Sequence, residues 1–178
     1  MVSVVGCALL ACSSPAARRP NMTVPGGARE LMATSNTGAT VEPKGDNQWL
    51  VRVTRSCAGA SATGEAVLKL AAQPGANDAP HAALAGSRAY LALGRAQLAA
   101  DKPSGAVECA QAGLAELGPN YVAPTAMDDT DLKVLAAEDL VGAGQVADGA
   151  STLLRVLEER ISLYEQLHAS ELAPLAAP

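Results

Sequence analysis

A short alternation of apolar and polar positions predicts one β-strand in the first third of the chain. Over residues 48–55, the apolar side chains of Trp49, Val51 and Val53 fall on one face, and mostly polar side chains fall on the other. This two-residue period is typical of a strand with one covered face. Turn-forming residues precede it, and residues 37–42 can supply a partner strand. We therefore expect a small β-hairpin.

The segment after this strand predicts a short helix. Residues 56–64 are a run of small side chains, and Thr63 at its end can cap a helix over residues 65–73. Pro74 and Gly75 would end that helix. Its apolar stripe would then cover the face of the hairpin that carries the tryptophan.

From Asn77 onward, apolar residues recur at the three- and four-residue spacing of amphipathic helices. Breaks in this pattern at residues 101–103, 118–127 and 142–144 divide the region into helices over about 78–100, 104–117, 128–141 and 146–173. The short turns within each pair predict two antiparallel helix hairpins. The expected fold class is therefore mainly α: two helix hairpins preceded by a small β-hairpin, a short helix and a disordered N-terminal tether.

The first helix pair resembles a tetratricopeptide repeat. Tyr90, Leu93-Gly94 and Ala106 have the offsets of that motif, and Pro119 falls one residue late. Small side chains at Gly94 and Ala106 would let the two helices approach closely. The second pair fits less well, because Glu138 occupies a position where the family has a small residue. A generic pair of Ala/Leu-rich helix hairpins is the alternative interpretation.

The resemblance implies a concave groove lined by the first helix of each pair. Arg88 and Arg95 lie two helical turns apart and could together bind a carboxylate or an acidic segment. In the alternative, both arginines are solvated and the leucines build the core. The family's groove positions fall on Arg88, Leu91, Arg95, Leu98, Leu132, Leu135 and Asp139.

The N-terminus resembles the signal segment of a bacterial lipoprotein. Residues 1–12 are mostly apolar and end in Leu9-Leu10-Ala11-Cys12, which is similar to the lipobox. No Lys or Arg precedes Arg18, although signal segments normally begin with positive charge. The resemblance implies removal of residues 1–11 and a lipid on Cys12. The run is too short to span a bilayer, which requires about 20 apolar residues.

These observations divide the chain into four expected parts: a signal segment at 1–11, a flexible tether at 12–36, a hairpin and helix subdomain at 37–75, and a helical-hairpin domain at 76–174. The resemblance implies a protein of the bacterial cell envelope, lipid-anchored on the periplasmic or extracellular face. The lipid-anchored protein would contact the membrane only through its anchor. A soluble protein is the alternative.

Composition narrows the class of partner. Hydrophobic residues make up 49% of the 178 residues, but there is no Phe, one Trp and three Tyr. Such a core consists of small side chains and needs close contacts between helices. The net charge is −5 and there is no basic block, which argues against nucleic acid. We expect a protein or peptide partner and no cofactor.

The cysteines outside the signal segment, Cys57 and Cys109, stand alone and form no CxxC pair. In an oxidising compartment they could form a disulfide, which would stabilise the fold by about 4 kcal/mol. Two buried free thiols are the alternative, which the sequence favours.

No catalytic or metal constellation can be assembled from sequence spacing. Neither His81 nor His168 has a neighbouring Cys or a second His at helical spacing, so no metal site is expected. The acidic cluster from Asp128 to Asp131 stands where a helix begins, which indicates capping. We expect a non-enzymatic interaction or assembly module. The alternative is a small hydrolase or metal-dependent enzyme that uses Cys57 or the Asp128–Asp131 cluster.

Overall fold

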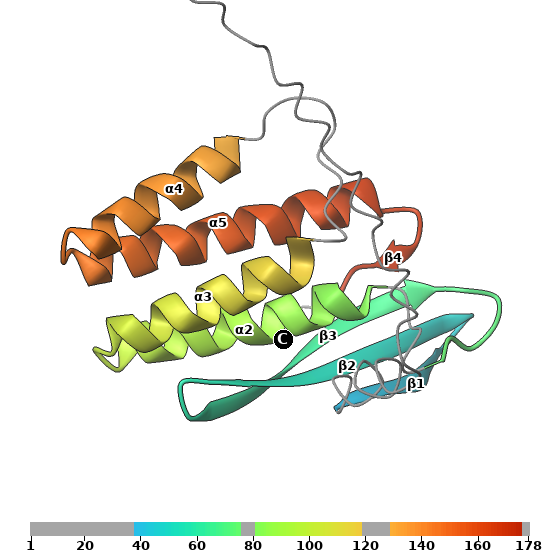
Figure 1. Cartoon of the computed structure of the whole chain (residues 1–178). Helices are drawn as coiled ribbons and strands as arrows, with labels where there is room; N and C mark the ends of the chain where they lie inside the picture. The colour runs from blue at the N-terminus through green and yellow to red at the C-terminus, as the bar shows by residue number, and fades with distance from the viewer. Residues whose placement is uncertain (1–37, 76–80, 119–128, 176–178) are drawn as a thin grey trace, which may run out of the picture.

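The computed structural model describes residues 38–75, 81–118 and 129–175, which form an antiparallel sheet covered on one face by helices (Figure 1). The strand order in the sheet is β1-β2-β3-β4. The strands are β1 (Ala39–Gly45), β2 (Gln48–Cys57), β3 (Ala60–Lys69) and β4 (Leu172–Ala173). The helices are α2 (Ala82–Ala99), α3 (Pro103–Leu117), α4 (Asp129–Gly142) and α5 (Val146–Leu167).

Two tight turns build the first three strands into consecutive hairpins. Asp46 and Asn47 join β1 to β2, and both have positive φ angles, 48° and 58°. Ala58 and Gly59 join β2 to β3 with φ angles of 47° and 77°. Paired positive φ angles are typical of the two-residue turns whose twist matches that of the flanking strands.

The predicted hairpin over the first two strands is confirmed. Ala39 pairs with Val53, and the register continues antiparallel toward the turn. Val51 and Val53 are fully buried, and the indole nitrogen of Trp49 donates to the carbonyl of Leu70 over 3.3 Å. The alternation in the sequence therefore identified the covered face of β2 correctly.

The predicted helix over residues 65–73 is wrong, because residues 65–69 belong to β3 and residues 70–73 form neither helix nor strand. All ten residues of β3 pair with β2, from Cys57 opposite Ala60 to Gln48 opposite Lys69. Gly64 explains why the strand fits here: a Cβ on it would lie 1.8 Å from the carbonyl oxygen of Ala85 in α2. The expected mainly-α class with a small hairpin is therefore also wrong. The fold is mixed, with a four-stranded antiparallel sheet packed against helices.

The helices α2, α3 and α4 lie close to their predicted ranges, whereas the last helix is shorter than expected. It ends at Leu167 instead of continuing to about residue 173. The chain turns at residues 168–171, and β4 then pairs with Val67 and Leu68 of β3. The strand pairing ends the helix. Asp78 and Pro80, the expected start of the first helix, lie outside the described residues.

One hydrophobic core joins the sheet to the helices. The helix α2 lies on β2 and β3, α5 packs against α2 and α3, and α4 packs against α5 (Figure 1). The core contains buried side chains from both the expected subdomain at 37–75 and the expected domain at 76–174. Its largest fully buried hydrophobic side chains include Val51, Val53, Leu68, Leu84, Leu117, Leu153 and Leu157.

The expected close contact between Gly94 and Ala106 is present, but it involves a third helix. Ala106 is fully buried, and a Cβ on Gly94 would lie 3.5 Å from the Ala106 carbonyl oxygen. The same Cβ would lie only 2.4 Å from Leu154 of α5. The helix next to α2 and α3 is therefore the second of the later pair, and the described helices show no clear tetratricopeptide-like repeat.

Candidate functional site

The described residues include a cluster of polar side chains around a buried histidine, His81. This residue caps the N-terminus of α2 with a left-handed backbone, φ 63°, which is uncommon for a residue other than glycine. Its carbonyl oxygen accepts a hydrogen bond from the amide of Ala85 over 3.2 Å. Its imidazole is buried, with 3% of the side chain exposed. The imidazole must therefore find its polar partners within the protein.

Two partners come from the C-terminal part of the chain. The His81 Nδ1 atom lies 2.6 Å from the hydroxyl of Tyr164 in α5. The Nε2 atom lies 2.8 Å from Oε2 of Glu171, in the turn between α5 and β4. Both ring nitrogens are thus engaged, and the start of α2 is joined to the end of α5.

His168 completes what we call the His81 cluster, which consists of His81, Tyr164, His168 and Glu171. The Nδ1 atom of His168 lies 3.6 Å from the same Glu171 oxygen. Its ring centroid lies 4.8 Å from that of His81 and 4.4 Å from that of Tyr164. The chain contains only two histidines, and the fold places them in contact.

Burial is the main cause of the pKa shifts of His81 and Tyr164. Desolvation lowers the pKa of His81, while its hydrogen bond to Glu171 acts in the opposite direction and the charge of His168 lowers the pKa further. Desolvation and the Glu171 charge raise the pKa of Tyr164. A neutral imidazole beside a protonated phenol follows at neutral pH. Such an imidazole has one N–H group and one free lone pair.

A hollow of about 430 Å³ lies beside the cluster, lined in part by Ala169 and Leu172. Its charged side chains are paired with each other or with the backbone. Arg88 donates to the Glu65 carbonyl oxygen and, over 2.7 Å, to Glu165. The Lys69 ammonium donates to the carbonyl of Ala169 over 3.3 Å. These contacts tie the end of α5 to β3.

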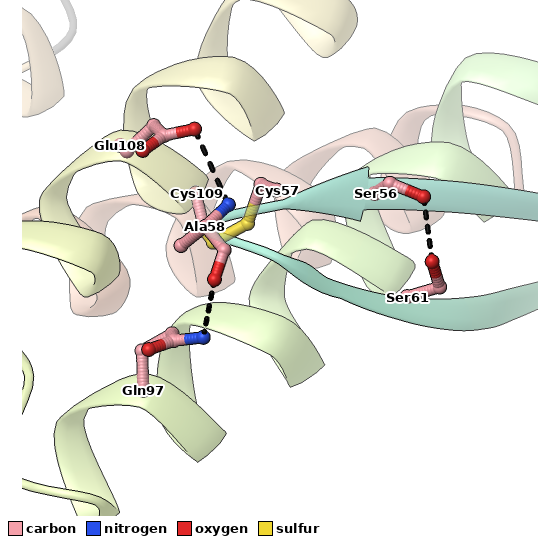
Figure 2. The surroundings of a disulfide bond; sticks show 7 residues. All are labelled: Ser56, Cys57, Ala58, Ser61, Gln97, Glu108 and Cys109. Carbon is pink, nitrogen blue, oxygen red and sulfur yellow. Dashed lines mark hydrogen bonds between the residues drawn. A yellow bond between two sulfur atoms is a disulfide. The ribbon is translucent and has the colours of Figure 1, made fainter.

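A second site joins the sheet to the helices at the turn between β2 and β3 (Figure 2). Cys57 and Cys109 form a disulfide with a Cα–Cα distance of 5.6 Å. The Glu108 carboxylate accepts from the amide of Ala58 over 3.3 Å, and the Gln97 side chain donates to the Ala58 carbonyl over 3.2 Å. The structure thus has the bridge, whereas the sequence favoured two free thiols. As a disulfide, Cys57 has no thiolate for nucleophilic attack.

The groove residues predicted on α2 face α5. Arg88 and Arg95 pair with Glu165 and Glu158 of that helix. Leu91 is buried in the core, and Leu98 is half-buried against it.

The groove residues predicted on α4 occupy a different surface. Leu132, Leu135 and Asp139 are exposed, and Leu135 lines a hollow with Leu114 of α3. The structure therefore does not unite the two predicted sets in one groove.

The remaining predicted sites divide by where they fall in the chain. Cys12 and Asp128 lie outside the described residues. The Asp131 carboxylate forms an ion pair with Arg160 of α5. The His81 cluster was missed from the sequence, because its members lie in three elements and no short spacing connects His81 to the others.

Comparison with known proteins does not change this description. No protein-family model, curated protein or solved structure matches the chain. Within the part of the chain that the structure describes, no helix has the length and apolar character needed to cross a membrane.

Proposed function

We propose that this chain is a lipid-anchored binding protein of the bacterial cell envelope, which acts as a protein-interaction or assembly module. The observation that carries the proposal is the Cys57–Cys109 disulfide. Disulfides of this kind persist in oxidising compartments, such as the bacterial periplasm, and are rare in the cytosol. The bridge is an integral part of the fold, because it joins β2 to α3 across a separation of 52 residues.

The lipobox-like sequence supports the same compartment from an independent direction. Lipidation of Cys12 would place the whole domain outside the cytoplasm, where Cys57 and Cys109 can be oxidised. Residues 12–36 would then connect the lipid to the first strand. The two observations depend on different cysteines, so each can be tested without the other.

The surface of α4 supports binding as the activity. Leu132 and Leu135 are 57% and 58% exposed, more than any other large hydrophobic side chain among the described residues. Leu135 borders a hollow of about 420 Å³ together with Leu114 and Val134. Ala115, Asp131 and Arg160 complete its lining. An apolar centre with charged groups around it is typical of protein interfaces, so this surface fits an apolar segment of a partner protein.

The contacts of Cys57 and Asp131 support binding over the enzyme alternative. That alternative required Cys57 as a nucleophile or the Asp128–Asp131 cluster as a ligand set. Cys57 is bonded to Cys109, and the Asp131 carboxylate is paired with Arg160. A binding module is therefore the function that the geometry favours.

Expression in a bacterium with the native start tests the anchor. The protein should partition into detergent and have a mass that corresponds to acylation at Cys12 with residues 1–11 removed. Cys12→Ala should abolish the added mass while the Cys57–Cys109 disulfide still forms. Recovery of unmodified full-length protein from the cytosol, with Cys57 and Cys109 both reduced, would contradict the proposal.

A photo-crosslinking residue at position 135 tests the binding surface in the same cells. We expect it to capture a defined partner, and Leu132→Asp/Leu135→Asp should abolish capture by a crosslinker placed at position 136. Ala96→Asp/Ala99→Asp is the matched control, since these exposed positions on α2 have the same spacing and gain the same charges. Equal capture by both double variants would exclude the α4 surface.

A further inference from the structure

We propose that His81, His168 and Glu171 bind a divalent transition-metal ion, with Zn²⁺ as the preferred ion. One ligand atom from each residue can be chosen so that all three lie within 4.8 Å of one another. The set contains the only two histidines of the chain. Two imidazoles with one carboxylate suit zinc and its neighbours in the first transition row, and do not suit Mg²⁺ or Ca²⁺, which prefer oxygen ligands.

The distances are close to those of a metal site. Ligand atoms about 2.0–2.2 Å from a tetrahedral zinc lie about 3.4 Å from one another. The Glu171 oxygen is 2.8 Å from His81 Nε2 and 3.6 Å from His168 Nδ1. These two separations bracket the required value, and the third, between the two imidazole nitrogens, lies within 4.8 Å. Small rotations of the half-exposed Glu171 and His168 side chains can bring all three atoms to one ion.

Tyr164 provides the hydrogen bond that a metal-binding histidine needs. Such histidines almost always donate their second ring N–H to another group, which fixes the tautomer and the ring orientation. The Tyr164 hydroxyl lies 2.6 Å from His81 Nδ1 and is buried with it. If Nδ1–H donates to Tyr164, the lone pair of Nε2 faces the Glu171 carboxylate. Two acceptors then face each other, and a cation bound between them would stabilise this arrangement.

Without a metal, the other tautomer satisfies the same atoms. Tyr164 would donate to His81 Nδ1, and Nε2–H would donate to Glu171. The two states differ in which His81 nitrogen carries the proton, so the tautomer reports whether the ion is bound.

The end of α5 adds a favourable field for a cation. His168 is the C-cap residue of α5, and Glu171 follows within the next turn. The C-terminus of a helix has partial negative charge, which stabilises a nearby positive ion. Three protein ligands leave one tetrahedral position for water. The ion would then join the start of α2 to the connection between α5 and β4.

Titration of the full chain with Zn²⁺ tests this proposal. The protein should contain Cys7→Ala and Cys12→Ala, so that thiols of the N-terminal segment cannot bind the metal, and should first be treated with a chelator. Calorimetry should show one site per chain. Bound Co²⁺ should give the visible absorption of a tetrahedral ion. A change in the His81 tautomer on addition of Zn²⁺ should appear in the nitrogen chemical shifts of the imidazole.

Four variants locate the ion. His168→Gln and Glu171→Gln each remove a ligand from an exposed or half-exposed position and should weaken Zn²⁺ binding by at least about 10-fold. Tyr164→Phe keeps all three ligands and should weaken binding by about 10- to 100-fold through its hydrogen bond to His81. Glu158→Gln, on the exposed face of the same helix, is the matched control and should bind as the parent does.

Two results would overturn the proposal. A dissociation constant for Zn²⁺ above about 1 mM would show that the cluster is held by hydrogen bonds alone. Tighter binding that His168→Gln and Glu171→Gln both leave unchanged would place the metal elsewhere in the chain. Neither result depends on lipidation at Cys12 or on the α4 surface, so the metal site and the proposed function can fail separately.

Discussion

The two ends of β3 are attached to the helices in different ways. Next to its start, the last residue of β2 is bonded covalently to α3 through Cys57–Cys109. At its end, β3 pairs with β4, and the connection between α5 and β4 reaches α2 through the His81 cluster. One attachment is a covalent bond that only a reductant breaks. The other consists of side chains that can exchange protons and bind an ion, so solution conditions can modulate it without unfolding the sheet.

Removing the covalent attachment should have the largest effect on stability. Cys57→Ala/Cys109→Ala opens a loop of 52 residues and should lower the free energy of unfolding by about 4 kcal/mol. Urea denaturation of oxidised protein and of the variant measures the difference. Reductant should destabilise the parent to a similar extent and leave the variant unchanged. An equal effect of reductant on both proteins would contradict a stabilising bridge.

The middle of β3 should respond almost as strongly to a single methyl group. Gly64→Ala would place a Cβ 1.8 Å from the Ala85 carbonyl oxygen and 2.7 Å from the Ala89 amide. Neither backbone atom can move alone, so we expect a loss of about 3 kcal/mol in thermal or urea unfolding. In Gly142→Ala, the new Cβ meets no atom within 4 Å, so this control should keep or slightly raise stability. Equal stability of the two variants would disprove the close approach of β3 to α2.

Removing one hydrogen bond of the His81 cluster should have a moderate effect on stability. Tyr164→Phe leaves the buried His81 Nδ1 atom without its partner and should cost about 2 kcal/mol when measured in the presence of a chelator. Tyr90→Phe removes the hydroxyl of a half-buried tyrosine that packs near the disulfide, and it serves as the control. A larger loss from Tyr90→Phe than from Tyr164→Phe would contradict a stabilising hydrogen bond between Tyr164 and His81.

The smallest effect is expected at Arg95, which belongs to neither attachment. Its ion pair with Glu158 is exposed, with 54% of each side chain accessible. Exposed pairs contribute little, so Arg95→Ala should change stability by less than about 1 kcal/mol. The less exposed pair of Arg55 with Glu116, at 15% and 18%, provides the contrast, and Arg55→Ala should cost more. A larger loss of stability from Arg95→Ala than from Arg55→Ala would show that exposure does not determine how much these ion pairs contribute.

The sequence predicted those elements whose signals are local. The alternation around Trp49 identified β2, and the breaks at residues 101–103 and 142–144 located the turns between helices. The strand β3 was missed because its first half consists of small residues, so no hydrophobic period distinguishes it from a loop. Its turn, Ala58-Gly59, also lacks the Asn-Gly or Asp-Gly signature of such turns.

The His81 cluster could not be predicted from the sequence for a related reason. His81 meets Glu171 only because β4 returns to the edge of β3, and that pairing involves only Leu172 and Ala173. The sequence expectation of a helix to residue 173 would have placed Glu171 within α5. A two-residue strand has no periodicity, so the contact that assembles the cluster is visible only in three dimensions.

The position of the disulfide also determines how the domain would respond to mechanical load. The covalent loop from Cys57 to Cys109 encloses β3, α2 and the first part of α3. A pulling force applied between the two ends of the chain passes through the sulfur atoms and cannot extend the residues within the loop. The bridge thereby withholds about 180 Å of contour length, given about 3.5 Å for each of its 52 residues. Under tension, the unfolding extension would come only from β1, β2 and the segments after Cys109, and a reductant would release the remaining length.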